Sequence, residues 1–389
     1  GFNDDVYDIQ IQSNGRIVVA GDFTSFRDTA RGRGLFRLNP IGTRDASFGF
    51  TGVSDYISSA MVESGGSILI GGAFTNFGPT LSNYFVRITS AGVSDPTFDT
   101  TSSQSNGAIQ AMARQADGKL IIGGTFTVFK GIAMKRIARL HRDGSVDTSF
   151  HAGNAFDNGV VNALAVQPNG KIIVGGTFTS HNGIASPRLV QLDMDGSRDM
   201  TFNAGGAGPN STVNALLLLA NGKVMVGGAF TSYNSISCGS LIRLDATGNR
   251  DLSFNQGGTG MSGTVNAIVL QTDSFLVAGG GFSSYNGTSA LRLIRLSPQG
   301  VRDASFLSTS FSSSATEPIQ TVSSPLSVLQ IGSGVPQKRE RLKFQSTRFS
   351  SQLPNLPVPV EAGFQLMVLF SSIMRSLKAV VLMNQASNG

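Results

Sequence analysis

The carboxylates of one turn are the first residues in this chain whose spacing could do chemistry. Asp193, Asp195 and Asp199 stand around Gly196, and a calcium loop likewise offers oxygen ligands at alternate positions around a glycine. The same turn occurs six times, but only its glycine and its final aspartate are present in every copy. A turn needs glycine for a positive φ and aspartate for an Asx hydrogen bond. The pattern therefore favours a structural turn, with a calcium site as the alternative.

Aromatic and amide side chains form a second set, just after a phenylalanine that recurs along the chain. They are His181-Asn182, Tyr233-Asn234 and Tyr285-Asn286, with Phe26, Phe77 and Phe129 in the aromatic position of the earlier copies. Such pairs on the loops of one face could stack on sugars, hydrogen-bond to them, or anchor a protein. The alternative, which the phenylalanines favour, is that the rings fill the space between neighbouring repeats. We expect Tyr233 and Tyr285 to be the most exposed of these residues.

Arginine and aspartate recur together, eight residues apart. The pairs are Arg37–Asp45, Arg87–Asp95, Arg139–Asp147, Arg243–Asp251 and Arg295–Asp303, with Gln191 in place of the arginine once. A hairpin of that size could bring each pair together as a partly buried ion pair. A ring of arginines that binds an anionic polymer is the alternative. One aspartate for each arginine favours the ion pairs.

Residues suited to catalysis are few. His141, His151 and His181 lack the spacing of a zinc site, and Cys238 has no neighbour in the sequence that would activate its thiol. We therefore expect no catalytic residue, no cofactor and no metal. An enzyme built from the repeats described below would need acidic, histidine or metal-ligating residues that differ from the repeat and cluster at one end of the fold. We predict no such cluster.

Repeats of about 52 residues must position these side chains. The phenylalanine of a GGxFT motif returns after a step of 51 and then four steps of 52 residues, and a D-x-x-F motif follows the same interval. Copies of one supersecondary unit at this interval are typical of solenoids and propellers. The copy at Val161–Gly205 predicts a strand, a PNG turn of type I′, a second and a third strand, and a short fourth strand at Asp199–Phe202.

Four short antiparallel strands per repeat, covered on both faces by neighbouring repeats, are typical of a propeller blade. We predict an all-β propeller of six blades, in which the first strands line a central channel. One position near the start of these strands is polar, with Asn162, Asn214 and Asn266 in the later copies and Tyr7, Ser58 and Gln110 in the earlier ones. These side chains could hold a ligand or ordered water.

The repeat resembles the delta-60 repeat of bacterial β-propeller proteins. The resemblance lies in the pattern V-x-A-[IL]-x-x-Q-x-[ND]-G-K-[IL]-[IV]-[IV]-G-G-x-F-T and in the later G-x-x-D-x-[ST]-F, over residues 6 to 306. Kelch repeats also place two glycines after an apolar strand, but their tryptophan is absent here. The delta-60 resemblance implies a propeller in an extracellular or cell-surface setting and no known catalytic site.

We therefore expect a non-enzymatic scaffold or binding module that recognises a protein or a glycan through loops on one face. A propeller enzyme, such as a kelch-like oxidase or a glycan hydrolase, is one alternative. A structural spacer within a larger surface protein is another.

The end of the chain departs from the repeat. After Phe306 only Pro318–Val322 resembles the opening of a first strand. We therefore divide the chain into a propeller at residues 1–316 and a divergent tail at residues 317–389. The tail is either a degraded seventh repeat produced by a frameshift, and then poorly ordered, or a basic linker followed by a helix over residues 363–383.

Charge and composition limit the partners. Residues 1–316 carry 23 basic and 21 acidic side chains, and residues 317–389 carry 7 and 3, so the repeats offer no basic stripe for nucleic acid. Arg375 and Lys378 interrupt the apolar run of the tail, which argues against a membrane span. The single cysteine excludes an intrachain disulfide. We expect a monomer whose signal peptide lies outside this segment.

Overall fold

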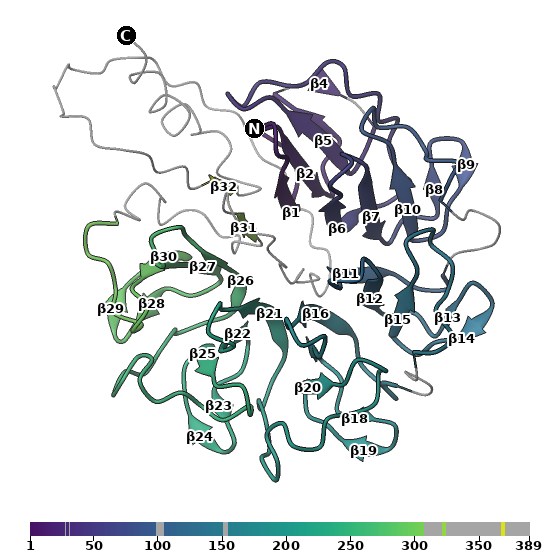
Figure 1. Cartoon of the computed structure of the whole chain (residues 1–389). Coiled ribbons are helices and arrows are strands. Elements are labelled where there is room, and N and C mark those ends of the chain that lie inside the picture. The colour runs from purple at the N-terminus through teal and green to yellow at the C-terminus, as the bar shows by residue number, and fades with distance from the viewer. Residues whose placement is uncertain are drawn as a thin grey trace, which may run out of the picture.

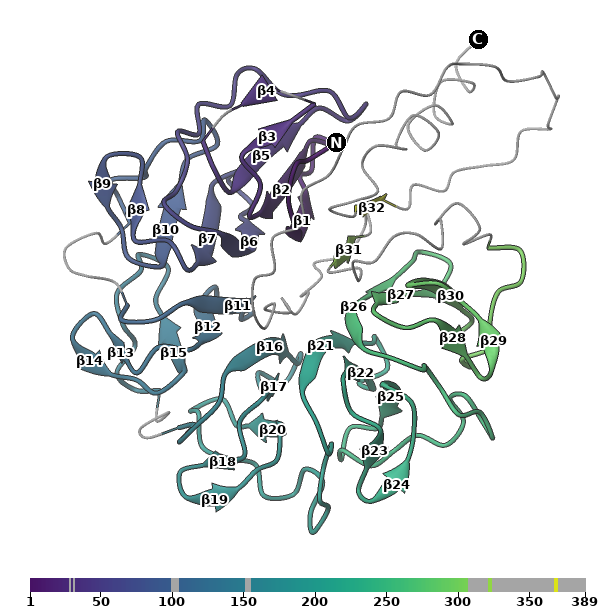
Figure 2. The ribbon, with the colours of Figure 1, turned by 180° about the vertical axis from the view of Figure 1, so that it is seen from behind.

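The structure is a computed structural model that describes residues 1–98 apart from 28 and 31, residues 105–150, residues 155–306, and two strands at Thr321–Ser323 and Met367–Leu369. The described residues form strands and turns, with no helix. Six three-stranded sheets lie around a common centre, each with one strand toward the middle (Figures 1 and 2). The chain is an all-β propeller, as the sequence predicts.

Each blade contains five strands. The first blade has β1 (Val6–Ile11), β2 (Ile17–Gly21), β3 (Ser25–Phe26), β4 (Thr29–Ala30) and β5 (Leu35–Leu38). The second has β6 (Ile57–Val62), β7 (Ile68–Gly72), β8 (Asn76–Phe77), β9 (Thr80–Leu81) and β10 (Phe85–Ile88). The third has β11 (Ile109–Arg114), β12 (Leu120–Gly124), β13 (Val128–Phe129), β14 (Ile132–Ala133) and β15 (Ile137–Leu140).

The remaining blades repeat this order. The fourth has β16 (Val161–Val166), β17 (Ile172–Gly176), β18 (Ser180–His181), β19 (Ile184–Ala185) and β20 (Leu189–Leu192). The fifth has β21 (Val213–Leu218), β22 (Val224–Gly228), β23 (Ser232–Tyr233), β24 (Ile236–Ser237) and β25 (Leu241–Leu244). The sixth has β26 (Val265–Leu270), β27 (Leu276–Gly280), β28 (Ser284–Tyr285), β29 (Thr288–Ser289) and β30 (Leu293–Leu296).

The sheet of a blade has three antiparallel strands, and the two very short strands form a separate hairpin. In the fourth blade the order is β16-β17-β20, with β18 paired to β19. The expectation of a fourth strand at Asp199–Phe202 is wrong, because only Leu192 and Arg198 form a bridge there and a turn follows. The carboxylate of Asp199 accepts hydrogen bonds from the amide and hydroxyl of Thr201, and such local bonds compete with strand pairing.

The turn between the first two strands of a blade is a three-residue hairpin. In the first blade the amide of Gly15 donates to the carbonyl oxygen of Gln12 at 2.9 Å. Only the third residue of the turn has a positive φ, 76° at Gly15, whereas a type I′ turn needs two. The type I′ expectation is therefore wrong. In the sixth blade Ser274 takes this left-handed conformation, with a φ of 69°.

The two glycines of GGxFT permit close approaches of the chain. A Cβ on Gly124 would lie 2.0 Å from the carbonyl oxygen of Ala108, just before the inner strand of the same blade. A Cβ on Gly123 would lie 2.4 Å from the side chain of Val161 in the next blade. The first glycine therefore brings two blades together, and the second brings two strands of one blade together.

The hydrophobic core lies largely between neighbouring blades. One cluster joins Ile121 and Phe150 of the third blade to Leu164, Val174 and Phe178 of the fourth, and similar clusters join other neighbours. The phenylalanine of every GGxFT motif is at most 1% exposed. Each blade thus buries its face on the next, so the blades stabilise one another.

A seventh position in the ring holds two short strands. Strand β31 (Thr321–Ser323) pairs antiparallel with β32 (Met367–Leu369) and contacts the inner strands β26 and β1, between which it lies in Figures 1 and 2. This strand falls where the sequence resembles the opening of a first strand. The alternative of a helix over residues 363–383 is wrong at Met367–Leu369, which form β32. The predicted boundary near residue 316, and the predictions for the rest of the tail, lie outside the described residues.

Candidate functional site

The two tyrosines that we expected on the surface are buried. Tyr233 is 1% exposed and Tyr285 2%, and their hydroxyls donate to the carbonyl oxygens of Gly248 and Gly300 at 2.5 Å. The expectation that these two rings are the most exposed of the set is therefore wrong, and the interpretation that the phenylalanines favour, rings that fill the space between repeats, is confirmed for them. The ring fills the gap between blades, and the hydroxyl, which phenylalanine lacks, binds the turn of the same blade.

The asparagines that follow these tyrosines belong to turns. Asn234 has a φ of 50°, its Nδ2 donates to the side-chain oxygen of Asn203, and its Oδ1 accepts from the amide of Gly208. Asn286 makes the equivalent bonds to Asn255 and Gly260. Left-handed backbone and local hydrogen bonds are typical of asparagine in turns.

His181 is the residue of this set with unsatisfied polar atoms. It is 1% exposed, its ring lies edge-on to Phe156 at 5.0 Å between centroids, and neither ring nitrogen has a hydrogen-bond partner among the described residues. Burial, and then the charge of Arg198, lower its pKa to about 4. The neighbouring Asn182 takes a φ of 50° in the turn. The imidazole is therefore neutral in the fold at ordinary pH.

A lysine lies between the carboxylates that resemble a calcium loop. The ammonium of Lys171 is 2.6 Å from Asp199 and 3.0 Å from Asp193, and Asp195 accepts from the amide and hydroxyl of Ser197. Asp195 thus forms an Asx turn, and Lys171 supplies the positive charge between Asp193 and Asp199 that a calcium ion would supply in a calcium loop. No group of three or more possible ligands is placed to hold a metal in the part of the chain that the structure describes.

The predicted arginine–aspartate ion pairs are confirmed in all five blades. In the third blade Nε of Arg139 donates to Asp147 at 2.8 Å, and Nη1 donates to the carbonyl oxygen of Met194 in the next blade. The guanidinium carbon lies 4.8 Å from the centroid of Phe150. Each such arginine therefore ties a turn to its own blade, and in four of the five also to the next.

The polar residues expected along the channel sit on β-bulges. The register between the first two strands shifts at each of these positions, Tyr7, Ser58, Gln110, Asn162, Asn214 and Asn266. The Nδ2 of Asn162 donates to the carbonyl oxygen of Val213, and that of Asn214 to Asn266, so these side chains bridge neighbouring inner strands. Re-aimed side chains are a usual product of bulges.

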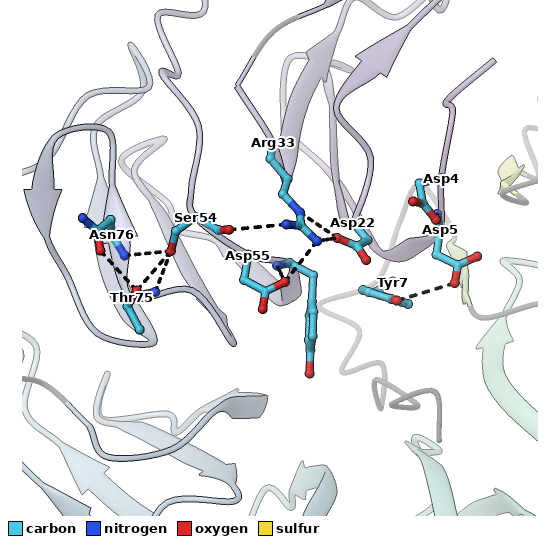
Figure 3. A network of polar contacts seen from close by, with 10 residues as sticks. Asp4, Asp5, Tyr7, Asp22, Arg33, Ser54, Asp55, Thr75 and Asn76 are labelled. Carbon is cyan, nitrogen blue, oxygen red and sulfur yellow. Dashed lines mark hydrogen bonds and ion pairs between the residues drawn. The ribbon is translucent and has the colours of Figure 1, made fainter. Parts of the chain in front are cut away.

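Acidic residues gather at the mouth of the channel where the first strands begin. Figure 3 shows Nε of Arg33 donating to Asp22 at 2.7 Å, with Asp55 3.1 Å from the same guanidinium. The hydroxyl of Tyr7 donates to Asp5 at 3.5 Å, and Asp4 precedes it. We call Asp4, Asp5, Asp22 and Asp55 the acidic mouth.

The acidic mouth corrects an expectation from the sequence. We predicted no acidic cluster that departs from the repeat, and that is wrong. The position of Asp22 is taken in the other copies by Ala73, Thr125, Thr177, Ala229 and Gly281. Burial raises the pKa of Asp22, and the hydrogen bond from Arg33 offsets only part of this. Burial likewise raises the pKa of Tyr7.

A cavity of about 1240 Å³ lies at the opposite mouth, where the first strands end. We call it the turn mouth. Its lining includes the last residue of each inner strand, which is aliphatic in five blades and an arginine in one: Ile11, Val62, Arg114, Val166, Leu218 and Leu270. The hairpin turns at Gln12–Arg16 and Glu63–Gly66 form part of its rim. None of the described residues that line it is aromatic.

The charges at the turn mouth come from the first three blades. Arg114 donates through Nη1 to the carbonyl oxygen of Gly118 at 2.8 Å and through Nη2 to Glu63 of the second blade. Arg16 lies 3.5 Å from Asp45 and is 37% exposed. Arg142 is exposed, lies against Gly118, and pairs through its side chain with no described residue.

Sequence reasoning missed both mouths, although a signal for them was available. The repeat places Arg114 where the other copies have an aliphatic residue, and Glu63 where four copies have glutamine. A comparison of the copies, position by position, would have found these departures. That they meet across a blade boundary follows only from the packing of the second blade against the third.

The structure also bears on the lone cysteine and on membranes. Cys238 is buried, and burial raises the pKa of its thiol, which makes it a poor nucleophile. The described residues include no helix with the length and apolar character needed to cross a bilayer.

Family comparisons agree with the geometry of the blades. Four segments match the domain of unknown function DUF5122 beta-propeller, at residues 12–48, 64–98, 115–150 and 167–202. This chain is a DUF5122 β-propeller repeat protein. DUF5122 repeats are the delta-60 repeats, so the resemblance stated from the sequence is confirmed. Residues 189–325 also match the Rax2 C-terminal beta propeller domain. A comparison with curated proteins found no match.

Solved structures similar to this DUF5122 protein include a propeller domain, an extracellular domain and a bacterial surface component. The WD40 beta propeller domain of Doa1 has a TM-score of 0.54 at 15% identity, with 86% of this chain and 91% of that chain covered. The extracellular domain of a hybrid two-component system of B. thetaiotaomicron has a TM-score of 0.48 at 14% identity, covering 82% and 35%. PorZ, a surface component of the type-IX secretion system of Porphyromonas gingivalis, has 0.48 at 15%, covering 82% and 44%.

Proposed function

We propose that this chain is a non-enzymatic binding module that recognises a protein partner at the turn mouth. The observation that carries the proposal is the cavity of about 1240 Å³, whose lining departs from the repeat at Arg114 and Glu63. Most other side chains of the repeat are explained by packing, turns or ion pairs. Arg114 and Glu63 differ from the residues at the same positions of the other repeats, so the shared architecture does not require them and they can contribute to binding a partner.

The chemistry of the turn mouth supports a protein partner over a glycan. The cavity is somewhat larger than the 300–1,000 Å³ or so of a small-molecule pocket, and its rim is formed by hairpin turns. Among the described residues its walls hold no aromatic ring of the kind on which sugars stack, and the tyrosines expected to serve a glycan are buried. Arginine is enriched among the residues that anchor a protein partner, and the aliphatic surface beside it would be buried by apolar side chains of a peptide.

The acidic mouth favours a second candidate, a glycan hydrolase. Hydrolysis of a glycoside uses two carboxyl groups, one of them protonated, and burial raises the pKa of Asp22 beside three further aspartates. A panel of 4-nitrophenyl glycosides tests this. Turnover by the chain that is lost in Asp22→Asn and Asp5→Asn would support an enzyme, and no turnover of any glycoside would count against it.

Selection of random peptides displayed on phage tests the main proposal. Gly65 lines the turn mouth, has no positive φ, and has no atom within 4 Å of a Cβ built on it, so Gly65→Trp should fold and place a bulky ring at the rim of the cavity. Leu81→Trp is the matched control, because Leu81 is 66% exposed and lies outside the lining. Peptides that bind the chain and Leu81→Trp but not Gly65→Trp would support the proposal. Enriched peptides that bind all three proteins equally would contradict it.

The delta-60 resemblance is also the basis for a proposal about where the protein is located. We propose an extracellular or cell-surface location, with the chain acting as a monomeric recognition unit within its parent protein. Detection of the parent protein by protease accessibility on intact cells would check the location.

A further inference from the structure

We infer that the partner of the turn mouth is a peptide segment that combines carboxylates with apolar side chains. The inference rests on the proposed function and gives the ligand a chemical class. It predicts that carboxylates contact the first three blades while apolar side chains contact the last three. The asymmetry of the cavity, which the repeat alone would not produce, carries the argument.

The cationic side of the cavity is formed by Arg16, Arg114 and Arg142. Arg142 is the freest of these, because its exposed guanidinium pairs with no described residue. It lies against the glycine of the third hairpin turn, since a Cβ on Gly118 would be 2.0 Å from its Nε. An exposed guanidinium at the rim of a cavity can turn to bind a carboxylate through two parallel hydrogen bonds.

Arg16 differs from its counterparts in the other blades. The lysines at its repeat position, Lys119, Lys171 and Lys223, each lie 2.6 to 2.7 Å from the final aspartate of the turn. Arg16 lies 3.5 Å from Asp45, a carboxylate that Arg37 already binds at 2.7 Å. Arg16 therefore loses less ion-pair energy than those lysines would lose if its side chain turns toward a ligand.

Only one carboxylate offsets these cations within the cavity lining. Glu63 accepts from Arg114 and is the single acidic residue among the lining side chains, against five arginines. Two of the five, Arg37 and Arg87, hold the ion pairs of their own blades at 2.7 and 2.8 Å. Arg16, Arg114 and Arg142 against Glu63 leave an excess of positive charge, which would attract an acidic segment.

The apolar side is formed by the ends of the inner strands in the fourth to sixth blades. Val166, Leu218 and Leu270 are half-buried and line the cavity beside the buried Ala165 and Leu217. No charged side chain of these blades lines the cavity. Apolar side chains of a ligand would gain burial here, at about 25 cal/mol per Å² of apolar surface.

Fluorescence polarisation with labelled hexapeptides tests the inference on the full chain. The probe is Glu-Leu-Glu-Leu-Glu-Leu, and the matched peptides replace every Glu with Gln, every Glu with Lys, or every Leu with Ser. We expect the Glu-Leu peptide to bind at least about tenfold more tightly than any of the others, since a charge-assisted hydrogen bond contributes this much or more. Its affinity should fall as salt is raised.

Two variants place the binding at the cavity. Arg142→Gln should weaken the Glu-Leu peptide about tenfold, and since its side chain has no internal partner the fold should be unaffected. Arg27→Gln is the control, because Arg27 is exposed and lies outside the lining. Leu218→Ser should weaken the Glu-Leu peptide but not the Glu-Ser peptide.

The outcomes separate the ligand class from the proposed function. Equal binding of the Gln-Leu or Lys-Leu peptide, lost in Gly65→Trp, would overturn the acidic class and leave binding at the turn mouth intact. So would mouth-dependent phage peptides that are rich in lysine or free of charge. Binding of the Glu-Leu peptide that survives Gly65→Trp would overturn both.

Discussion

Replacing His181 with phenylalanine should stabilise the chain, because the buried imidazole has polar atoms that nothing satisfies. Both ring nitrogens lack a partner among the described residues, and the side chain is 1% exposed. Phenylalanine occupies this position in the first three blades. In the first blade Phe26 packs at 4.7 Å from Phe2, which stands where Phe156 faces His181. The new ring should therefore fit.

The magnitude follows from the two orphan nitrogens. A buried polar group without a hydrogen bond costs about 1–3 kcal/mol, so His181→Phe should raise the free energy of unfolding by about 1–3 kcal/mol near pH 8. Lower pH should enlarge the difference in the free energy of unfolding between His181→Phe and wild type. The pKa of His181 is lowered from 6.5 to about 4 in the fold, so the unfolded chain binds more protons between these values and wild type loses stability as pH falls through them. The loss amounts to about 3 kcal/mol by pH 4.

Urea unfolding followed by far-ultraviolet circular dichroism, at several pH values from about 8 to 4, measures both effects. His141→Phe is the control: that side chain is 46% exposed, and a surface change of this kind should alter stability by no more than about 0.5 kcal/mol. Equal stability of His181→Phe and wild type near pH 8, with the same pH dependence in both, would refute the reasoning. It would mean that a buried water satisfies the imidazole.

Three further substitutions test the account of the blades. Ser274→Gly should stabilise by about 1 kcal/mol, because the serine holds a φ of 69° that glycine adopts without strain; a thermal melt that moves down would contradict this. Gly124→Ala should destabilise by about 3 kcal/mol or more, because its Cβ would lie 2.0 Å from the carbonyl oxygen of Ala108, whereas Gly65→Ala has open space and should stay within about 0.5 kcal/mol; similar urea midpoints for the two would be contrary evidence. Asp147→Asn should cost about 3 kcal/mol and flatten the acid response. Burial alone would raise the pKa of Asp147, but hydrogen bonds from its lysine and serine partners hold it below the ordinary 3.8, so its contribution is present above pH 3.8 and is lost as pH falls below it; an unchanged acid limb in a pH titration would refute that.

The sequence predicted the architecture well because most of the repeat pattern describes turns and hairpins, which form between residues close together in the chain. Two glycines before a phenylalanine, and a glycine three residues after Gln12, mark strand ends and turns within one repeat, whereas the close approach of Gly123 to Val161 of the next blade could not be predicted from them. The arginine–aspartate pairs could be predicted for the same reason, since a hairpin brings residues eight apart together. The fourth strand at Asp199–Phe202 was wrongly predicted because the side chain of Asp199 bonds its own turn, and strand propensity takes no account of such local hydrogen bonds.

The candidate sites could be predicted less well, because they depend on which residues meet across blades. In the sequence Tyr233 resembles an exposed aromatic residue of a loop. Only the structure shows that its hydroxyl donates to a buried partner, the carbonyl oxygen of Gly248 in a later turn of the same blade. Arg114 and Glu63 are 51 residues apart, and the packing of the second blade against the third brings them to one cavity. The acidic mouth likewise joins two blades through Arg33.

Hydrogen exchange with a mouth-dependent peptide tests the central claim most directly, namely that the turn mouth is where this propeller binds. Amide exchange of the chain is measured by mass spectrometry with and without a selected peptide at saturating concentration. Protection at residues 12–16, 61–66 and 114–118, with no change at residues 4–7 and 54–56, is the result that the account predicts. Protection confined to residues 4–7, 22 and 54–56 would place binding at the acidic mouth and contradict it.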